Sequence, residues 1–225
     1  MNQGRLYLVS GPIGNFNDIT LRAIDILKSS DIILSEDTRE TSKLLNNLNI
    51  KAEQISYRDQ NHERIIDTVL GLLEEGKVLS LVSDSGTPVI SDPGFKLVRE
   101  LKNKNINVVP VPGPTAAMTA ISASGLPTDR FVFLGFLPKT SGRRQNLLKI
   151  YGDLDNTLII YESPYRIVKL LEEILETLGD RKVCLARELT KIHEEIVTDK
   201  VSILLEKTKN RSPKGEFVVM VSKED

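Results

Sequence analysis

The chain has 225 residues, of which 40% are hydrophobic and 27% are charged. This composition is typical of a soluble globular protein with enough material for one large domain or two small ones. Lys and Arg together number 30 against 31 for Asp and Glu, which gives a net charge of −1. A broadly basic nucleic-acid binder is therefore excluded, and any polyanionic partner must be held by local patches.

Cysteine content and hydropathy predict the compartment. The single cysteine, Cys184, lies in an apolar run and is expected to be buried and inert. One cysteine excludes a disulfide within the chain, which fits a reducing cytoplasm. The sequence contains no apolar run long enough for a membrane span and no signal-peptide pattern at Met1–Tyr7. We therefore expect a cytoplasmic protein that does not enter a membrane.

Short apolar runs alternate with helix-period segments through the first half of the chain. This alternation is typical of an open parallel α/β sheet. Thr20 is predicted to cap the first helix and Asn61 the third, and His62 is predicted to be an exposed surface histidine. The predicted strands are 5–9, 31–34, 53–57, 78–82 and 107–111, and the predicted helices end near 28, 48, 75 and 102.

Polar and small residues follow several of these strands, where an open sheet binds its ligands. Asp84 would lie at one such end, with Gly86 letting a ligand approach the backbone; an ordinary turn explains the segment equally well. Pro12 interrupts the first glycine-rich bend, which argues against a dinucleotide fold. Thr115 and Ala116 follow two prolines and would offer backbone amides at a helix start.

The second half reads as a mixed α/β domain, and we place the boundary so that the domains are 1–124 and 125–225. A basic, flexible linker at 137–144 is predicted to run into a short helix, and Gly179 is predicted to stop a later one. The remaining predicted strands are 131–136, 157–161, 182–186, 194–198 and 216–221, with a helix at 202–208.

The strand-end motifs together carry a family resemblance. They occur in the order 11–20, 35–39, 83–88, 111–116, 161–166, 186–195 and 214–217. The chain resembles the tetrapyrrole-methylase-like (class III) S-adenosylmethionine methyltransferases. Within them it resembles the ribosomal RNA small subunit methyltransferase I branch, which methylates a cytidine ribose 2′-hydroxyl in 16S rRNA. The resemblance implies two α/β domains with S-adenosyl-L-methionine in the cleft between them, a homodimer, and the small ribosomal subunit as partner.

The resemblance also implies a cofactor site and shows three departures. Ser85 stands where the branch has alanine, and Tyr165 stands where it has histidine. The sequence ends at Asp225, where members of the branch carry a further segment, and binding of RNA is expected to suffer if that segment holds the substrate. The implied cofactor-binding residues are Pro12, Asp84, Thr87, Thr115, Ala116, Tyr161 and Leu189.

A ribose hydroxyl is a poor nucleophile, so a general base would help its methylation. The candidates are Asp37, Glu162 and Glu188, each at a predicted strand end. The alternative for each is an ion pair with a nearby cation: Arg39, Arg166 and Arg187 respectively. For Asp37, a stabilising place at the start of a helix is a further alternative. The histidines and the cysteine lack the spacing of metal ligands.

Basic residues near the predicted loops are candidates for contacts with RNA phosphates. The candidates are Arg39, Lys139, Arg143, Arg144 and Lys191, of which Lys191 could instead lower the pKa of the hydroxyl. A later cluster comprises Lys207, Lys209, Arg211 and Lys214. The alternative for all of them is a solvated charged surface.

Two other functions remain open from sequence. A small-molecule enzyme of the same fold would methylate a carbon of a tetrapyrrole with the same cofactor loops. A ribosome-assembly protein that retains the fold would bind the cofactor without turnover.

Overall fold

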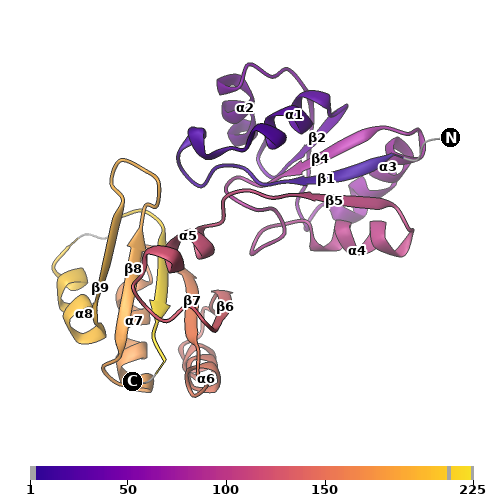
Figure 1. Cartoon of the computed structure of the whole chain (residues 1–225). Coiled ribbons are helices and arrows are strands. Elements are labelled where there is room, and N and C mark those ends of the chain that lie inside the picture. Colours follow the sequence, from indigo (N-terminus) through magenta and orange to yellow (C-terminus); the bar gives the residue numbers. More distant parts are fainter. Residues whose placement is uncertain (1–3, 212–213, 224–225) are drawn as a thin grey trace. The chain divides into compact units, whose positions relative to one another are not determined.

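In a computed structural model, which describes residues 4–211 and 214–223, the chain forms two compact units, Met1–Thr115 and Ala116–Asp225 (Figure 1). The sequence placed the boundary later, between residues 124 and 125. The difference is helix α5 (Ala116–Ala123), which packs on strands of the second sheet. Its amides and small side chains therefore belong to the second unit.

The first unit is built on a parallel five-stranded sheet of order β3-β2-β4-β1-β5. The runs at β4 and β1 are almost continuously apolar because both faces of the central strands are covered. All five predicted strands are confirmed. They are β1 (Arg5–Val9), β2 (Ile32–Ser35), β3 (Glu53–Ser56), β4 (Val78–Val82) and β5 (Asn107–Val111).

Two helices cover each face of this sheet (Figure 1). On one face Val9 and Ile33 of the strands pack with Leu27 and Leu45. On the other face a larger cluster packs the strands against the remaining two helices. The helices are α1 (Leu21–Ser29), α2 (Thr38–Asn47), α3 (His62–Glu74) and α4 (Phe95–Asn103), with a short 3₁₀ turn η1 (Phe16–Asp18) before α1.

The predicted helix caps meet different outcomes. Thr20 caps α1 as predicted, because its hydroxyl accepts from the Ala23 amide at 3.1 Å. Asn61 holds the N-cap position of α3, but its side chain makes no capping bond and instead accepts from the Arg58 amide at 2.8 Å. The prediction that His62 is exposed is wrong. His62 is buried, with its Nδ1 2.9 Å from the hydroxyl of buried Tyr57.

The second unit has a mixed five-stranded sheet of order β6-β7-β10-β8-β9, in which only β6 and β7 are parallel. The predicted strands of this half are present. They are β6 (Phe131–Phe136), β7 (Thr157–Glu162), β8 (Lys182–Arg187), β9 (Glu195–Lys200) and β10 (Phe217–Val221).

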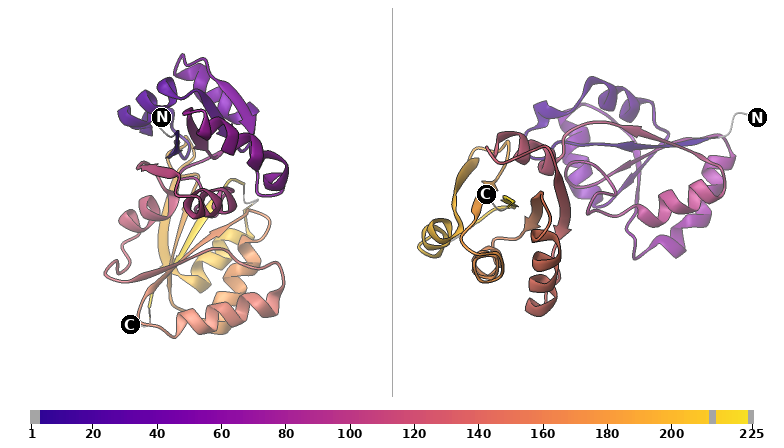
Figure 2. Two further views of the ribbon diagram at one scale, coloured as in Figure 1. Left: turned by 90° about the vertical axis from the view of Figure 1, so that its right-hand side faces the viewer. Right: turned by 60° about the horizontal axis from the view of Figure 1, so that its bottom comes forward.

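Three helices, α6 (Ser141–Gly152), α7 (Ile167–Leu178) and α8 (Val201–Lys209), share one core with alternate residues of the strands. Figure 2 shows this layer, coloured from salmon to yellow, along one side of the sheet. Cys184 stands between core residues Val183 and Leu185 of β8, so its side chain points to the opposite face. It is buried as predicted, and burial raises the pKa of its thiol.

The second half of the segment predicted as a flexible linker is helical. Helix α6 begins at Ser141 and runs for 12 residues, so it is not short. Arg144 lies inside it and is buried, with Nε and Nη2 donating to the Glu173 carboxylate at 2.6 and 2.7 Å. This buried pair fixes α6 on α7. Across the described residues, no helix is both long and apolar enough to span a bilayer.

Candidate functional site

Three loops at the carboxyl ends of β4, β1 and β5 are tied together in the first unit. The Gly11 amide donates to the Gly86 carbonyl at 2.8 Å, and the Gly86 amide donates to the Pro12 carbonyl at 3.1 Å. The Thr87 hydroxyl donates to the Pro114 carbonyl at 3.1 Å and lies 3.0 Å from the Ser10 hydroxyl. The predicted site residues Pro12 and Thr87 therefore belong to one hydrogen-bonded network. Two other predicted site residues are close to it in sequence: Asp84 is three residues before Thr87, and Thr115 directly follows Pro114.

Two positions in this network leave little room for a side chain and are glycines. Gly86 has φ +71°, and a Cβ there would lie 3.1 Å from Cγ2 of Ile13. At Gly113 an added Cβ would lie 2.8 Å from Cβ of Ser10, a distance that real Cβ atoms do not show. The glycines let the three loops approach each other closely.

The loop that follows β4 is also strained. Val89 has φ +76° and Ser91 has φ +62°, which is rare for any side chain and exceptional for a β-branched one. The loop is anchored at its end, where the Gly94 amide donates to Asp59 at 3.1 Å. Strain of this kind persists where the surrounding structure enforces it, and it gathers at binding sites and switches.

Carboxylates gather beside these loops, where β2 and β4 end. Asp84 Oδ1 accepts from the Asp37 amide at 3.0 Å, and Glu36 Oε2 accepts from the Asp84 amide at 3.3 Å. Burial raises the pKa of Glu36, and the charge of Asp84 adds to the rise. Burial likewise raises the pKa of Asp84, helped by the charge of Asp37. Two carboxylates are thus held where ionisation is disfavoured, which is common at functional sites.

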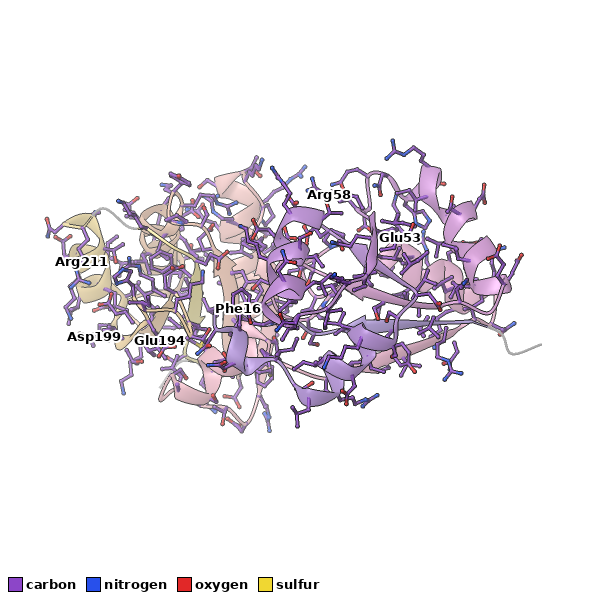
Figure 3. All side chains as sticks on the ribbon, turned by 90° about the horizontal axis from the view of Figure 1, so that it is seen from above. Phe16, Glu53, Arg58, Glu194, Asp199 and Arg211 are labelled. Atoms are coloured by element: carbon purple, nitrogen blue, oxygen red, sulfur yellow. The ribbon has the colours of Figure 1, made fainter. Side chains whose placement is uncertain are left out.

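Asp37 differs from its two neighbours because two arginines engage it. Arg39 donates Nε and Nη2 to the two oxygens of Asp37 at 3.0 and 2.6 Å, and its amide also bonds Oδ1 at 2.9 Å. These bonds hold the pKa of the Asp37 carboxyl well below its usual range. Arg58, labelled in Figure 3, lies 3.7 Å from Asp37 and donates to the Glu36 carbonyl at 2.9 Å. Both alternatives predicted for Asp37 are present: it caps α2 and pairs with Arg39.

In the second unit, Tyr161 occupies the backbone amide at the start of α5. The Ala117 amide donates to its hydroxyl at 3.1 Å. Its ring meets Phe133 edge-on at 4.9 Å and Phe136 at 5.6 Å between centroids. Tyr161 therefore links the end of β7 to Ala116, another predicted site residue.

Glu162, one residue further along β7, is almost fully buried and pairs with Arg166 at 3.0 Å. Its Oε1 also accepts from the Ser163 amide at 2.7 Å. The ion pair predicted as the alternative to catalysis is therefore formed. Arg166 reaches onward to the carbonyl of Leu137 at 2.8 Å, so this pair also holds the end of β6.

The loop after β8 lies at the same edge of the sheet, because Glu162 and Arg187 both pair with Phe217 of β10. Glu188 has φ +49° and Thr190 has φ +65°, and buried Leu189 lies between them. The hydroxyl of Thr190 is buried and has no hydrogen-bond partner among the described residues. Strained turns and unsatisfied buried polar groups gather at functional sites, so this loop is a candidate for binding a ligand.

Glu188 is paired, but not with the predicted partner. Lys191 Nζ lies 3.0 Å from Glu188 and 2.9 Å from Glu216. Desolvation opposes ionisation of Glu188, but bonds from the Glu216 amide and Lys191 outweigh it and lower its pKa. For Lys191, bonds to the same two carboxylates outweigh desolvation and raise its pKa. Arg187 instead lies 3.6 Å from Glu195.

The predicted RNA-contacting cations fall into three groups. Arg39, Lys139 and Arg143 are exposed. Lys191 is half-buried between two carboxylates. Arg144 is buried against Glu173, so the prediction that it contacts RNA is wrong for a physical reason: its guanidinium does not reach the surface.

Three cations of the later cluster are neutralised by nearby acids. Lys207 lies 3.2 Å from Asp199, and Arg211 lies 2.9 Å from Glu195. Figure 3 labels Asp199 and Arg211 at the α8 side of the second unit. Lys209 likewise lies 3.2 Å from Glu172. This surface carries less free positive charge than its sequence suggests.

Sequence reasoning did not select two residues that contact candidate site residues, Glu36 in the first unit and Phe136 in the second. Glu36 shares the cluster with Asp84, and its signal was its place beside Asp37 in the same strand-end motif. Phe136 contacts Tyr161, and its signal was an aromatic residue at the end of an edge strand. Both signals are local, so each residue could have been selected from the sequence.

A parallel α/β unit with linked strand-end loops, followed by a mixed α/β unit, is the architecture of one class of methyltransferases. The sequence profile described as Tetrapyrrole (Corrin/Porphyrin) Methylases matches residues 5–204, and the chain belongs to this family. Among solved structures, a cobalt precorrin-4 methyltransferase aligns with TM-score 0.72 at 20% identity, covering 97% of this chain and 94% of that one. A uroporphyrin-III C-methyltransferase from Thermus thermophilus, complexed with S-adenosylhomocysteine, aligns with TM-score 0.67 at 22% identity, covering 97% of each chain.

Curated relatives are more similar in sequence. The chain is 45% identical to the ribosomal RNA small subunit methyltransferase I of Thermotoga maritima, over 97% of this chain and 98% of that protein. It is 48% identical to the protein of the same name from Escherichia coli O157:H7, over 98% of this chain and 78% of that protein. These relatives confirm the branch that the strand-end motifs indicated.

Proposed function

We propose that this protein transfers a methyl group from S-adenosyl-L-methionine to the ribose 2′-hydroxyl of a cytidine in the 16S rRNA of the small ribosomal subunit. Support comes from the ribosomal RNA small subunit methyltransferase I of Thermotoga maritima, which is 45% identical over nearly the whole of both chains. The structural observation that carries the proposal is the pair of carboxylates, Glu36 and Asp84, held at raised pKa beside three linked strand-end loops. The proposal includes a homodimer in the cytoplasm.

The residues of the first unit fit S-adenosyl-L-methionine, which supplies a methyl group on a sulfonium sulfur. Asp84 and Glu36 offer carboxylate oxygens that can accept from ribose hydroxyls, and their negative charge favours a cation. The ring of Pro12 offers apolar surface, and the bare backbone at Gly86 permits close approach. Asp84 thus acts through charge and hydrogen bonding, while Pro12 acts through packing.

The other implied residues lie at the end of the first unit and in the second. Thr115 is the last residue of the first unit, Ala116 begins α5 in the second, and Tyr161 shapes the start of that helix. Leu189 is a buried apolar residue beside the unsatisfied hydroxyl of Thr190. A ligand that accepts or donates one hydrogen bond there would remove the cost of about 1–3 kcal/mol that an unpaired buried polar group carries.

We further propose that alignment, more than a side-chain base, drives the transfer. Correct orientation of two reactants is worth about 7–11 kcal/mol, whereas a base adds about 10²- to 10⁴-fold. Of the three candidate bases, Asp37 and Glu188 have lowered pKa values, and a lowered pKa weakens a base. Glu162 is buried in its pair with Arg166.

The role of the three carboxylates is tested by replacing them singly, as Asp37→Asn, Glu162→Gln and Glu188→Gln. Each variant should lose less than about tenfold in kcat, because only positioning is disturbed. A loss above about 100-fold at one position, with the affinity for S-adenosyl-L-methionine unchanged, would identify that residue as the base and overturn the proposal.

The function itself is tested with methyl-tritiated S-adenosyl-L-methionine and three acceptors in parallel. These are small ribosomal subunits lacking the modification, free 16S rRNA and uroporphyrinogen. We expect label in the subunits above that in free rRNA, because near-zero net charge disfavours capture of bare RNA. Label in the tetrapyrrole alone would contradict the proposal, and so would cofactor binding with no label in any acceptor. Sedimentation of the pure protein tests the homodimer.

A further inference from the structure

An aromatic ring at the end of β6 is largely exposed. Phe136 is 59% exposed, although it ends an edge strand whose inner residues are largely covered. Its ring meets Tyr161 at 5.6 Å, and Tyr161 in turn meets Phe133 at 4.9 Å. Phe136 is therefore supported by the ring of Tyr161, which Phe133 supports in turn, and more than half of Phe136 faces solvent.

The segment that follows Phe136 is held rigidly. Arg166 donates to the Leu137 carbonyl at 2.8 Å, and Nη1 of Arg144 donates to the carbonyls of Pro138 and Lys139 at 3.2 and 3.0 Å. Both guanidinium groups are themselves anchored by buried carboxylates, those of Glu162 and Glu173. A binding surface ordered in advance loses less conformational entropy when its ligand arrives.

Two unpaired cations lie at the end of this segment and in the first turn of α6. Lys139 and Arg143 are exposed, and within 4–211 and 214–223 neither side chain forms a hydrogen bond or an ion pair. Helix α6 contains no Asp or Glu that could neutralise them. The cations near α8 differ, since Lys207 and Arg211 each have an acidic partner.

We propose that Phe136 stacks on an unpaired base of the RNA substrate while Lys139 and Arg143 bind the adjoining phosphates. This inference rests on the proposed function and adds a specific contact to it. Stacking of a base on an aromatic side chain is worth about 1–3 kcal/mol and tolerates any base, because every base has a π-face. The two free cations favour a polyanion over a second copy of this chain, whose own net charge is only −1.

The test replaces Phe136 by alanine and compares it with Phe95→Ala, a control of the same residue type that is 57% exposed on the first unit. Binding of small ribosomal subunits and the KM for subunits are measured, together with the affinity for S-adenosyl-L-methionine. Phe136→Ala should weaken binding of subunits and raise the KM for subunits, each by about 5- to 150-fold, and Phe136→Trp should restore both values. Phe95→Ala should match the unaltered protein.

The phosphate contacts are tested through salt dependence. Lys139→Ala and Arg143→Ala should each reduce the slope of log affinity against log salt by about 0.7–0.9. Wild-type affinity in Phe136→Ala would overturn the proposal. A matching loss of S-adenosyl-L-methionine affinity would assign the ring to the cofactor, and a change of oligomeric state would assign it to a contact between copies; either result would also overturn it. Subunit binding that depends on Phe136 without any methyl transfer would preserve this inference and refute the proposed function.

Discussion

Replacing Arg144 with alanine removes one half of a buried ion pair. The side chains of Arg144 and Glu173 are 6% and 0% exposed, and two bonds of 2.6 and 2.7 Å join them. The change leaves the Glu173 carboxylate with only the Ser141 hydroxyl, which donates to it at 2.6 Å. It also removes the bonds that Arg144 donates to the carbonyls of Pro138 and Lys139, although Arg166 still donates to that of Pro138 at 3.4 Å. Breaking such a pair costs about 3–5 kcal/mol in the free energy of unfolding.

The cost should depend on pH in a definite direction. In the native protein, burial opposes ionisation of Glu173, but its bonds to Arg144 and Ser141 outweigh burial and lower its pKa. The stabilisation is therefore full above the ordinary carboxyl pKa and is lost as pH falls through the lowered one. Without Arg144, burial alone raises the pKa, so protonation relieves the variant as pH falls. Both effects make the difference between the two proteins smaller at low pH.

Urea unfolding followed by circular dichroism measures this difference at about pH 7.5 and about pH 5. Arg143→Ala, at the next residue and exposed, is the control and should change stability by less than about 0.5 kcal/mol. Replacing Arg144 and Glu173 together by leucine should be nearly neutral, because no buried charge is left unpaired. The reasoning is refuted if Arg144→Ala costs no more than its neighbour, or if its cost grows as pH falls.

Two further predictions concern the loops of the first unit. Gly86→Ala should lower the free energy of unfolding by about 1–2 kcal/mol and weaken cofactor binding, because Gly86 has φ +71°. Gly71→Ala in α3, with open space around it, should raise the free energy of unfolding by about 0.5–1 kcal/mol. Equal midpoints of the two variants in urea unfolding would contradict this. At pH values above the raised pKa of Glu36, Glu36→Gln should raise the free energy of unfolding by less than about 1 kcal/mol, and this gain should disappear at lower pH. Asp84→Asn should weaken cofactor binding about 10- to 150-fold, as measured by calorimetry. A cofactor affinity that survives Asp84→Asn would remove that carboxylate from the site.

The sheets could be predicted from sequence because their strands are buried. Leu79, Leu81 and Val82 form an apolar run that only a covered strand explains, and β4 is covered on both faces. Loops at the carboxyl ends of such strands follow from topology alone, which is how Asp84 became a candidate, whereas Thr87 was implied by the family resemblance. The strands and Asp84 needed only the local pattern.

The errors share one physical cause, which is a side-chain contact that the local residue pattern does not show. Arg144 looks like a surface residue until Glu173, 29 residues later, is placed beside it. His62 looks exposed until Tyr57 is seen to accept or donate a bond to its ring. The partner of Glu188 was missed because its φ of +49° turns the chain back and brings Lys191 to the carboxylate. Pattern reading of one sequence carries no information on such tertiary contacts.

The central claim is that this protein methylates a ribose oxygen of a cytidine in small-subunit rRNA. The most direct measurement labels unmodified subunits with methyl-tritiated S-adenosyl-L-methionine, digests the rRNA to nucleosides and identifies the labelled one by chromatography and mass. The account predicts that the label is in 2′-O-methylcytidine, and that it falls to background without the enzyme. Label in a base-methylated nucleoside would contradict the oxygen chemistry, and unlabelled rRNA would contradict the function.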